Sequence, residues 1–141
     1  MLQAMNSGHD GSLTTTHANN PRAALDRLQN LVQMSRAGAN MPPDAIMKII
    51  TEAVDFVVEI KRLPDGSRRV NNICEVCGMQ GNVPTIGSIM KFQKTSVDGN
   101  GRIMGEFRPT GSRIVSEEHK ERFYSNGIEI KPEWFDNGGL W

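Results

Sequence analysis

The chain has 141 residues, and its 16 Lys and Arg residues balance 16 Asp and Glu residues, so the formal net charge is zero. That length suffices for one domain with a modest core. The neutral balance argues against nucleic acid as a partner and against an anchor to acidic lipids, since both need a large basic field. No apolar run approaches the length of a membrane span, and the first residues lack the basic stretch of a signal peptide. We therefore expect a cytoplasmic protein.

The first residues, MLQAMNSG, are typical of the end of a helix. Leu2 and Met5 share one helical face, and Gly8 suits the left-handed position that closes a helix. Residues 11–16, GSLTTT, then predict a short strand.

Two helices are predicted after this strand. The first extends from about Pro21 to Ser35, with Asn19 or Asn20 as its N-cap and Pro21 in its first turn. The second starts near Pro43. The order strand, helix, helix favours an α/β fold. The expected buried positions are Ala24, Leu25, Leu28, Leu31 and Val32 in the first helix, and Ala45, Ile46, Ile49, Ile50 and Ala53 in the second.

The second half of the chain predicts two β-hairpins and a polar helix. The first hairpin joins VDFVVEIKR to RRVNNICEVCGM through the turn LPDGS, and the second joins TIGSIMKFQKT to RIMGEFRPTG through VDGNG. The helix extends from about Ser116 to Ser125 and is closed by Asn126-Gly127. Three residues of the tail are expected to be apolar anchors, namely Ile128, Trp134 and Phe135.

His17 lies between the predicted strand end and the predicted helix start. In open α/β sheets, ligands gather at the carboxyl ends of strands, beside helix N-termini. Free N–H groups and a partial positive charge at a helix start favour a phosphate, and a histidine there can donate a hydrogen bond to it. On spacing alone, a histidine that only satisfies the turn is the simpler interpretation.

Cys74 and Cys77 form a C-x-x-C pattern, which can be half of a zinc site or a redox pair. They are the only cysteines, which excludes a disulfide-rich secreted scaffold. Both belong to a strand pattern, where residues three apart point to opposite faces. We therefore prefer two unrelated cysteines, at least one of them a buried small hydrophobe.

Residues 98–101, DGNG, resemble the start of a calcium loop, but a tight hairpin turn is the simpler interpretation. Arg22 falls in the first turn of the predicted helix, where a cation is unfavourable unless an anion or an acidic neighbour is near. Arg27 is a further scattered cation, and Arg68 and Arg69 are most simply a solvated hairpin edge. The chain has no G-x-x-x-x-G-K-[ST], G-x-S-x-G or H-E-x-x-H motif, so spacing alone declares no activity.

The residues themselves carry a resemblance. MLQAMNSGHDGSLTTTHANNPRAALDRLQNLV closely resembles the histidine-box region of secretion and pilus-assembly ATPases, in particular the CpaF-type ATPases of Flp/Tad pili. The likeness continues through AVDFVVEIKRLPDGSRRVNNICEVCGMQG and DGNGRIMGEFRPTG to NGIEIKPEWF. It therefore covers essentially the whole chain in order, and GHDGSLTTTHANNP is its specific part.

The resemblance implies an α/β fold: the C-terminal part of a RecA-like nucleotide-binding domain, followed by β-hairpins and a short C-terminal helix. Residues 1–55 would belong to the ATPase core with the histidine box. Residues 56–110 would be hairpins that complete the sheet, and residues 111–141 a terminal helix and tail. The histidine of the family's histidine box, matched by His17, lies near the terminal phosphate of the nucleotide and couples its state to domain movement.

The resemblance also implies a homohexameric ring that uses ATP and magnesium. Such rings work at the inner face of the cytoplasmic membrane with platform proteins of a pilus or secretion machine. The family's phosphate loop and Walker B segment precede the position that matches Met1, so we expect a fragment that alone binds no cofactor and hydrolyses no ATP.

Two other classes of function stay open at this stage. The hairpins could offer an exposed edge to a protein partner, which would make the chain a stand-alone interaction module. The C-x-x-C pair could alternatively define a metal or redox protein, and this interpretation predicts bound zinc.

Overall fold

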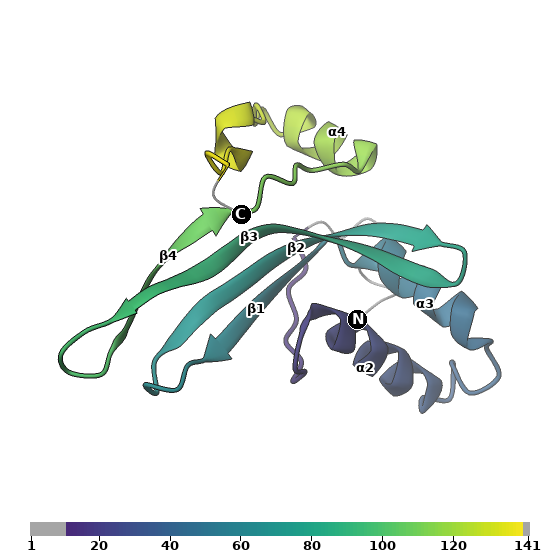
Figure 1. Cartoon of the computed structure of the whole chain (residues 1–141). Helices are drawn as coiled ribbons and strands as arrows, with labels where there is room; N and C mark the ends of the chain where they lie inside the picture. The colour runs from purple at the N-terminus through teal and green to yellow at the C-terminus, as the bar shows by residue number, and fades with distance from the viewer. Residues whose placement is uncertain (1–10, 140–141) are drawn as a thin grey trace. The chain divides into compact units, whose positions relative to one another are not determined.

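The computed structural model of the chain describes residues 11–139. Within that range, the chain forms helices and a four-stranded sheet in which strands adjacent in sequence are also neighbours in space (Figure 1). The predicted helix end at residues 1–8 lies outside the described residues. The elements are α2 (Pro21–Gln33), α3 (Pro43–Ala53), β1 (Phe56–Arg62), β2 (Arg68–Gln80), β3 (Val83–Val97), β4 (Ile103–Pro109), α4 (Glu117–Ser125) and the 3-10 helix η1 (Pro132–Phe135).

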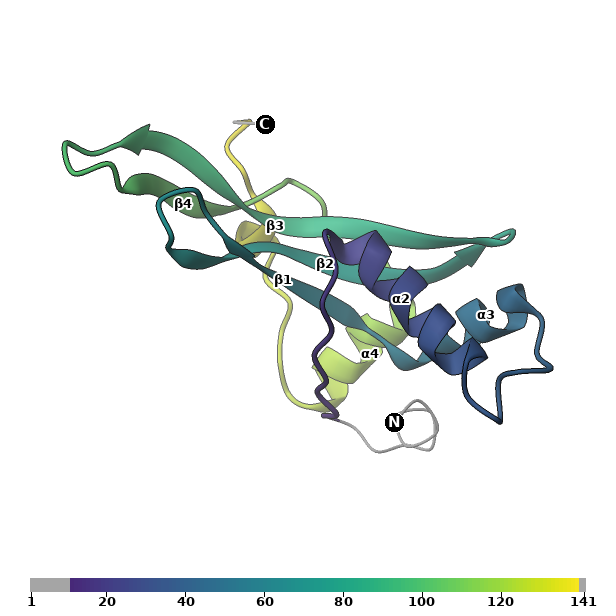
Figure 2. The same ribbon diagram turned by 90° about the horizontal axis from the view of Figure 1, so that it is seen from below.

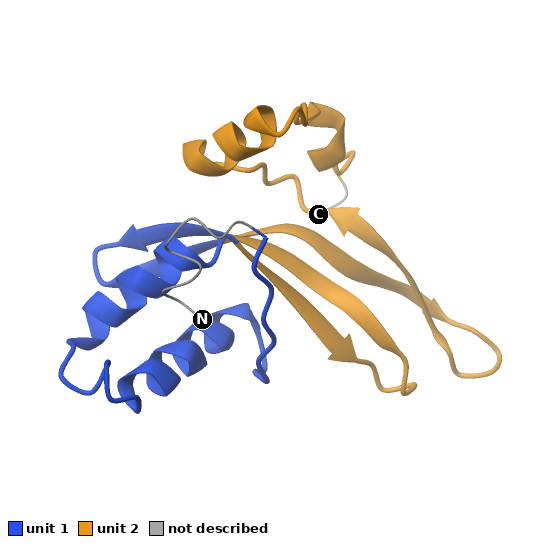
Figure 3. Ribbon diagram, turned by 180° about the vertical axis from the view of Figure 1, so that it is seen from behind, with its two compact units in different colours: residues 1–55, 76–86 blue, residues 56–75, 87–141 orange. Residues whose placement is uncertain are grey.

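The chain divides into two compact units (Figure 3). Unit 1 comprises residues 1–55 and 76–86, and unit 2 comprises residues 56–75 and 87–141. The helices and strands together confirm the broad prediction of a mixed α/β chain. The order of helices and hairpins also agrees with the order predicted from the sequence.

Helices α2 and α3 lie side by side in unit 1 (Figures 1 and 2). Each begins with a proline in its first turn, as predicted, because the missing proline N–H costs nothing where a helix has no acceptor for it. In α2 only Ala24 and Leu25 are buried, whereas Leu31 is 51% exposed, so its predicted apolar face is too wide. Helix α3 buries Ile46, Met47, Ile50, Thr51 and Ala53.

The strand predicted at residues 11–16 is wrong. Residues 12–18 have no regular secondary structure, and Leu13 is 98% exposed. A strand exists only where a neighbour accepts and donates its backbone hydrogen bonds. The described sheet has the order β1-β2-β3-β4 and does not include this segment.

Both predicted hairpins are confirmed. Strands β1 and β2 pair antiparallel from Phe56↔Glu75 to Arg62↔Arg68, and β3 and β4 pair from Met90↔Pro109 to Val97↔Ile103. Each pairing contains one irregularity, which is typical of a β-bulge that bends the strand.

Asp65 organises the turn between β1 and β2. Its Oδ1 accepts hydrogen bonds from the Ser67 N–H (3.0 Å) and hydroxyl (2.7 Å), and its Oδ2 accepts one from the Ile103 N–H (2.7 Å). These donors, the Ile103 N–H first among them, lower the pKa of Asp65 from 3.8 to about 2. The same carboxylate thus shapes its own turn and connects it to the first residue of β4.

Arg68 and Arg69 are both exposed, as predicted for a solvated edge, but Arg69 also makes specific contacts. Its guanidinium lies 5.3 Å from the centre of the Phe92 ring, and its Nη2 donates to the Ile103 carbonyl at 3.3 Å. Cation–π attraction and the planar guanidinium explain this position on the sheet. Arg68 is exposed and lies opposite Arg62 in the β1–β2 register.

The core of unit 2 gathers Ile89, Ile114 and Phe135, with Phe56 and Phe123 packed against it. Of the predicted tail anchors, only Phe135 is buried. Ile128 is 43% and Trp134 44% exposed, so the prediction is wrong for both residues. The short helix η1 has only four residues, and Phe135 is the one that it buries.

Helix α4 is connected to the sheet by the Glu75 cluster, which we define as Glu75, Val115, Ser116 and His119. The Glu75 side chain is 1% exposed, and its carboxylate accepts hydrogen bonds from the N–H groups of Val115 (2.9 Å) and Ser116 (3.1 Å). His119 Nδ1 lies 2.8 Å from Glu75 Oε1, and its ring centroid lies 5.2 Å from that of Phe56. The predicted cap of α4 is confirmed, since Ser116 Oγ accepts from the His119 N–H.

Candidate functional site

The segment that carries His17 enters helix α2 through a capped corner. Asn20 has an extended backbone, and its Oδ1 accepts a hydrogen bond from the Ala23 N–H at 2.8 Å. The Asn20 carbonyl accepts the Ala24 N–H at 3.1 Å. This is the geometry expected of an asparagine N-cap followed by proline, so the predicted helix start is confirmed.

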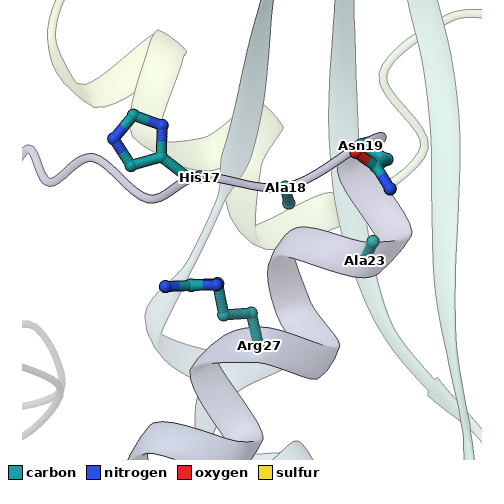
Figure 4. A pocket seen from close by; sticks show the side chains of 5 residues that line it. All are labelled: His17, Ala18, Asn19, Ala23 and Arg27. Carbon is teal, nitrogen blue, oxygen red and sulfur yellow. The ribbon is translucent and has the colours of Figure 1, made fainter.

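An open hollow of about 500 Å³ lies at this corner. It is lined by His17, Ala18 and Asn19 from the incoming segment and by Ala23 and Arg27 from α2 (Figure 4). The structure therefore brings His17 together with Arg27, which the sequence placed on a helix without assigning it a role. The two alanines keep the hollow open, because neither has a side chain that could fill it.

The described side chains that line the hollow are basic or uncharged. None of the five described residues that line it is acidic, and the first turn of α2 contains no acidic residue. The Arg22 N–H has no hydrogen-bond acceptor among residues 11–139. A helix start with a free amide and a nearby guanidinium attracts an anion rather than a cation.

Arg22 lies in the same helical turn but belongs to another arrangement. Its Nη1 donates to the Pro84 carbonyl at 2.9 Å, and its Nε lies 3.9 Å from the Asp26 carboxylate. The acidic neighbour that a first-turn cation requires is therefore Asp26. Because of this contact, the Asp26 carboxylate lies near Arg22 rather than near Arg27.

The two cysteines differ in environment. Cys74 is buried, as predicted, and burial raises the pKa of its thiol. Cys77 is half-buried, and neither cysteine is in a disulfide. Among residues 11–139 no group of three or more His, Cys, Asp or Glu side chains is placed to hold a metal ion. A raised pKa disfavours the thiolate that redox and zinc chemistry need.

The DGNG segment is a hairpin turn, which confirms that prediction. Asp98 Oδ1 accepts the N–H groups of Asn100 (2.9 Å) and Arg102 (2.8 Å), so this carboxylate oxygen binds backbone. The Asp98 N–H in turn donates to the Arg102 carbonyl at 2.9 Å, which closes the turn.

Among residues 11–139, no helix has the length and apolarity that a membrane span requires. The model of one protein family, the type II/IV secretion system proteins, matches residues 1–124. This chain belongs to that family.

Individual relatives agree with this assignment. The chain is 37% identical over 82 residues to the conjugal transfer protein TrbB of Rhizobium radiobacter, which covers 58% of this chain and 23% of TrbB. It is 41% identical over 76 residues to the probable conjugal transfer protein TrbB of Sinorhizobium fredii, covering 54% and 21% of the two chains. It is 35% identical over 72 residues to the type IV secretion system protein VirB11 of Bartonella quintana, covering 51% and 20%. The chain thus spans between a fifth and a quarter of the length of these relatives.

Proposed function

We propose that this chain is the histidine-box part of a CpaF-type ATPase that powers pilus assembly or type II/IV secretion. His17 would sense the γ-phosphate of ATP. The observation that carries the proposal is the hollow in front of α2, where His17 lies beside a capped helix start and an arginine, with no acidic residue among those of the described lining. Membership of the type II/IV secretion system family supports the same function.

His17 would act by donating a hydrogen bond to a terminal phosphate oxygen. When that phosphate leaves, the imidazole loses its partner, and the segment before Asn20 is free to shift with α2. A single side chain can shift the balance between two conformations of a segment when its contacts differ between the two nucleotide states. The γ-phosphate is the group whose contacts order switch segments in other nucleotide hydrolases.

The phosphate loop and the magnesium ligands of a nucleotide site are not assigned to residues of this chain. The sequence contains no phosphate-loop motif. The described residues provide no cluster of ligands that fits magnesium, so no step is assigned to that ion here. In the complete ATPase, a phosphate-loop lysine and magnesium would stabilise the transferring phosphoryl group. We further propose a homohexameric ring at the inner face of the cytoplasmic membrane, bound to platform proteins.

The chain alone is expected to hydrolyse no ATP, because it lacks the phosphate-loop lysine that phosphoryl transfer requires. The measurement is release of inorganic phosphate from ATP by the purified chain, with the His17→Ala variant as its control. Turnover by the parent chain above that of the variant would contradict the proposal that this chain alone hydrolyses no ATP.

A second candidate function is a stand-alone interaction module. It is favoured by one observation: β1 is an edge of the described sheet and exposes 54% of Val58 and 68% of Ile60. An apolar edge strand is a template for a partner strand. The DNA upstream of Met1 discriminates the two functions, since an in-frame phosphate loop supports the ATPase and a promoter with a ribosome site supports the module.

A further inference from the structure

Arg27 reaches the hollow from the second turn of α2. Ala23 and Arg27 are four residues apart on the helix, so they share one face, and both line the hollow with His17. Figure 4 shows the Arg27 side chain extending from α2 on the side of the corner where the His17 ring lies. The small side chain of Ala23 leaves the path from Arg27 to the helix start open.

Among residues 11–139, Arg27 has no ion-pair partner that would explain its position. Its neighbour Asp26 lies within 3.9 Å of Arg22, and Arg27 forms no ion pair with another described residue. Arg27 is also exposed, so it does not contribute to the buried face of α2 that contains Ala24 and Leu25. The Arg27 guanidinium is exposed and forms no ion pair among residues 11–139, so it is available to a ligand.

We propose that Arg27 and His17 together bind one phosphate group in the hollow, and that Arg27 supplies its permanent positive charge. The inference rests on the proposed function of the hollow and adds to it a second ligand-binding residue. A neutral imidazole donates one hydrogen bond, whereas a guanidinium donates several in a planar fork that matches two phosphate oxygens. Arg27 therefore provides most of the affinity, and His17 reports occupancy.

The test is a titration of the full chain with inorganic phosphate, followed by NMR of the His17 ring protons. Arg27→Gln keeps a good helix former at an exposed position, so α2 is expected to stay folded. We expect its apparent Kd for phosphate to rise about tenfold, the loss typical of one charge-assisted hydrogen-bond pair. Arg27→Lys keeps the charge but loses the planar fork, so its apparent Kd is expected to lie between those of the parent chain and of Arg27→Gln.

Arg36→Gln is the matched control, because Arg36 is exposed beyond the end of α2 and does not line the hollow. Phosphate binding by this variant should equal that of the parent. If Arg27→Gln binds phosphate as the parent does while the His17 signals still respond, the role of Arg27 is overturned and the proposed function stands. If the His17 signals of the parent do not respond to phosphate at all, both are overturned.

Discussion

Replacing Glu75 by alanine is expected to release helix α4 from the sheet and to lower the free energy of unfolding by about 3 kcal/mol. The Glu75 carboxylate is almost fully buried and accepts the N–H groups of Val115 and Ser116 as well as facing His119 Nδ1. Alanine would leave three polar groups of the Glu75 cluster without this acceptor. Buried donors without a partner cost far more than an exposed hydrogen bond contributes.

Urea unfolding followed by far-UV circular dichroism measures this loss. Glu75→Gln retains one acceptor oxygen in the same volume and should lose only about half as much stability. Glu117→Ala is the control, since Glu117 pairs with Lys120 on the surface of α4 and should cost less than about 1 kcal/mol. A Glu75→Ala variant as stable as Glu117→Ala would show that the cluster does not hold α4.

Replacing Leu25 by alanine is expected to cost about 3 kcal/mol in unit 1, the usual result of emptying a fully buried leucine site. Leu25 has no exposed surface, and neither have Ile46 and Ile50 on the adjacent helix α3. The smaller side chain would remove apolar contact and leave a cavity that the two helices cannot close completely.

Leu31→Ala is the control for this prediction, because Leu31 lies on the same helix and is 51% exposed. It should cost less than about 1 kcal/mol. Hydrogen exchange of the α2 and α3 amides, measured beside urea unfolding, reports the loss locally. Equal protection of these amides in both variants would contradict the assigned core of unit 1.

Sequence reasoning predicted the elements whose ends have local chemistry. Asn20 with Pro21 begins α2, Ser116 begins α4, and the turns at Asp65 and Asp98 close the hairpins. These signals act within four residues, so they are visible in a single sequence. The strand at residues 11–16 could not be predicted in this way, because a strand depends on a neighbour that local sequence does not specify.

Long-range polar contacts were the other part that sequence could not supply. Glu75 occupies a strand position between two cysteines. Nothing in the surrounding sequence indicates that the N–H groups of residues 115 and 116 donate hydrogen bonds to it. Asp65 was recognisable as a turn residue but not as the acceptor for Ile103. Both contacts form only when elements far apart in sequence meet.

The candidate site was half predictable. His17 was identified from its place before a helix start and from the resemblance of its surroundings to a histidine box. The convergence of Arg27 on the same hollow needed the structure. The signal that could have found it is the helical spacing of Ala23 and Arg27, which places both on the face that begins at the cap.

The most direct test of the account is the response of the His17 ring to ATP and to ADP, measured by NMR on the intact chain at about millimolar nucleotide, where a weak, transient contact that leaves no cofactor bound still shifts the ring signals. A γ-phosphate sensor should show larger shifts of its ring signals with ATP than with ADP, while the buried His119 serves as an internal reference. Equal shifts of the His17 signals with the two nucleotides, or none with either, would contradict the claim that His17 senses the γ-phosphate.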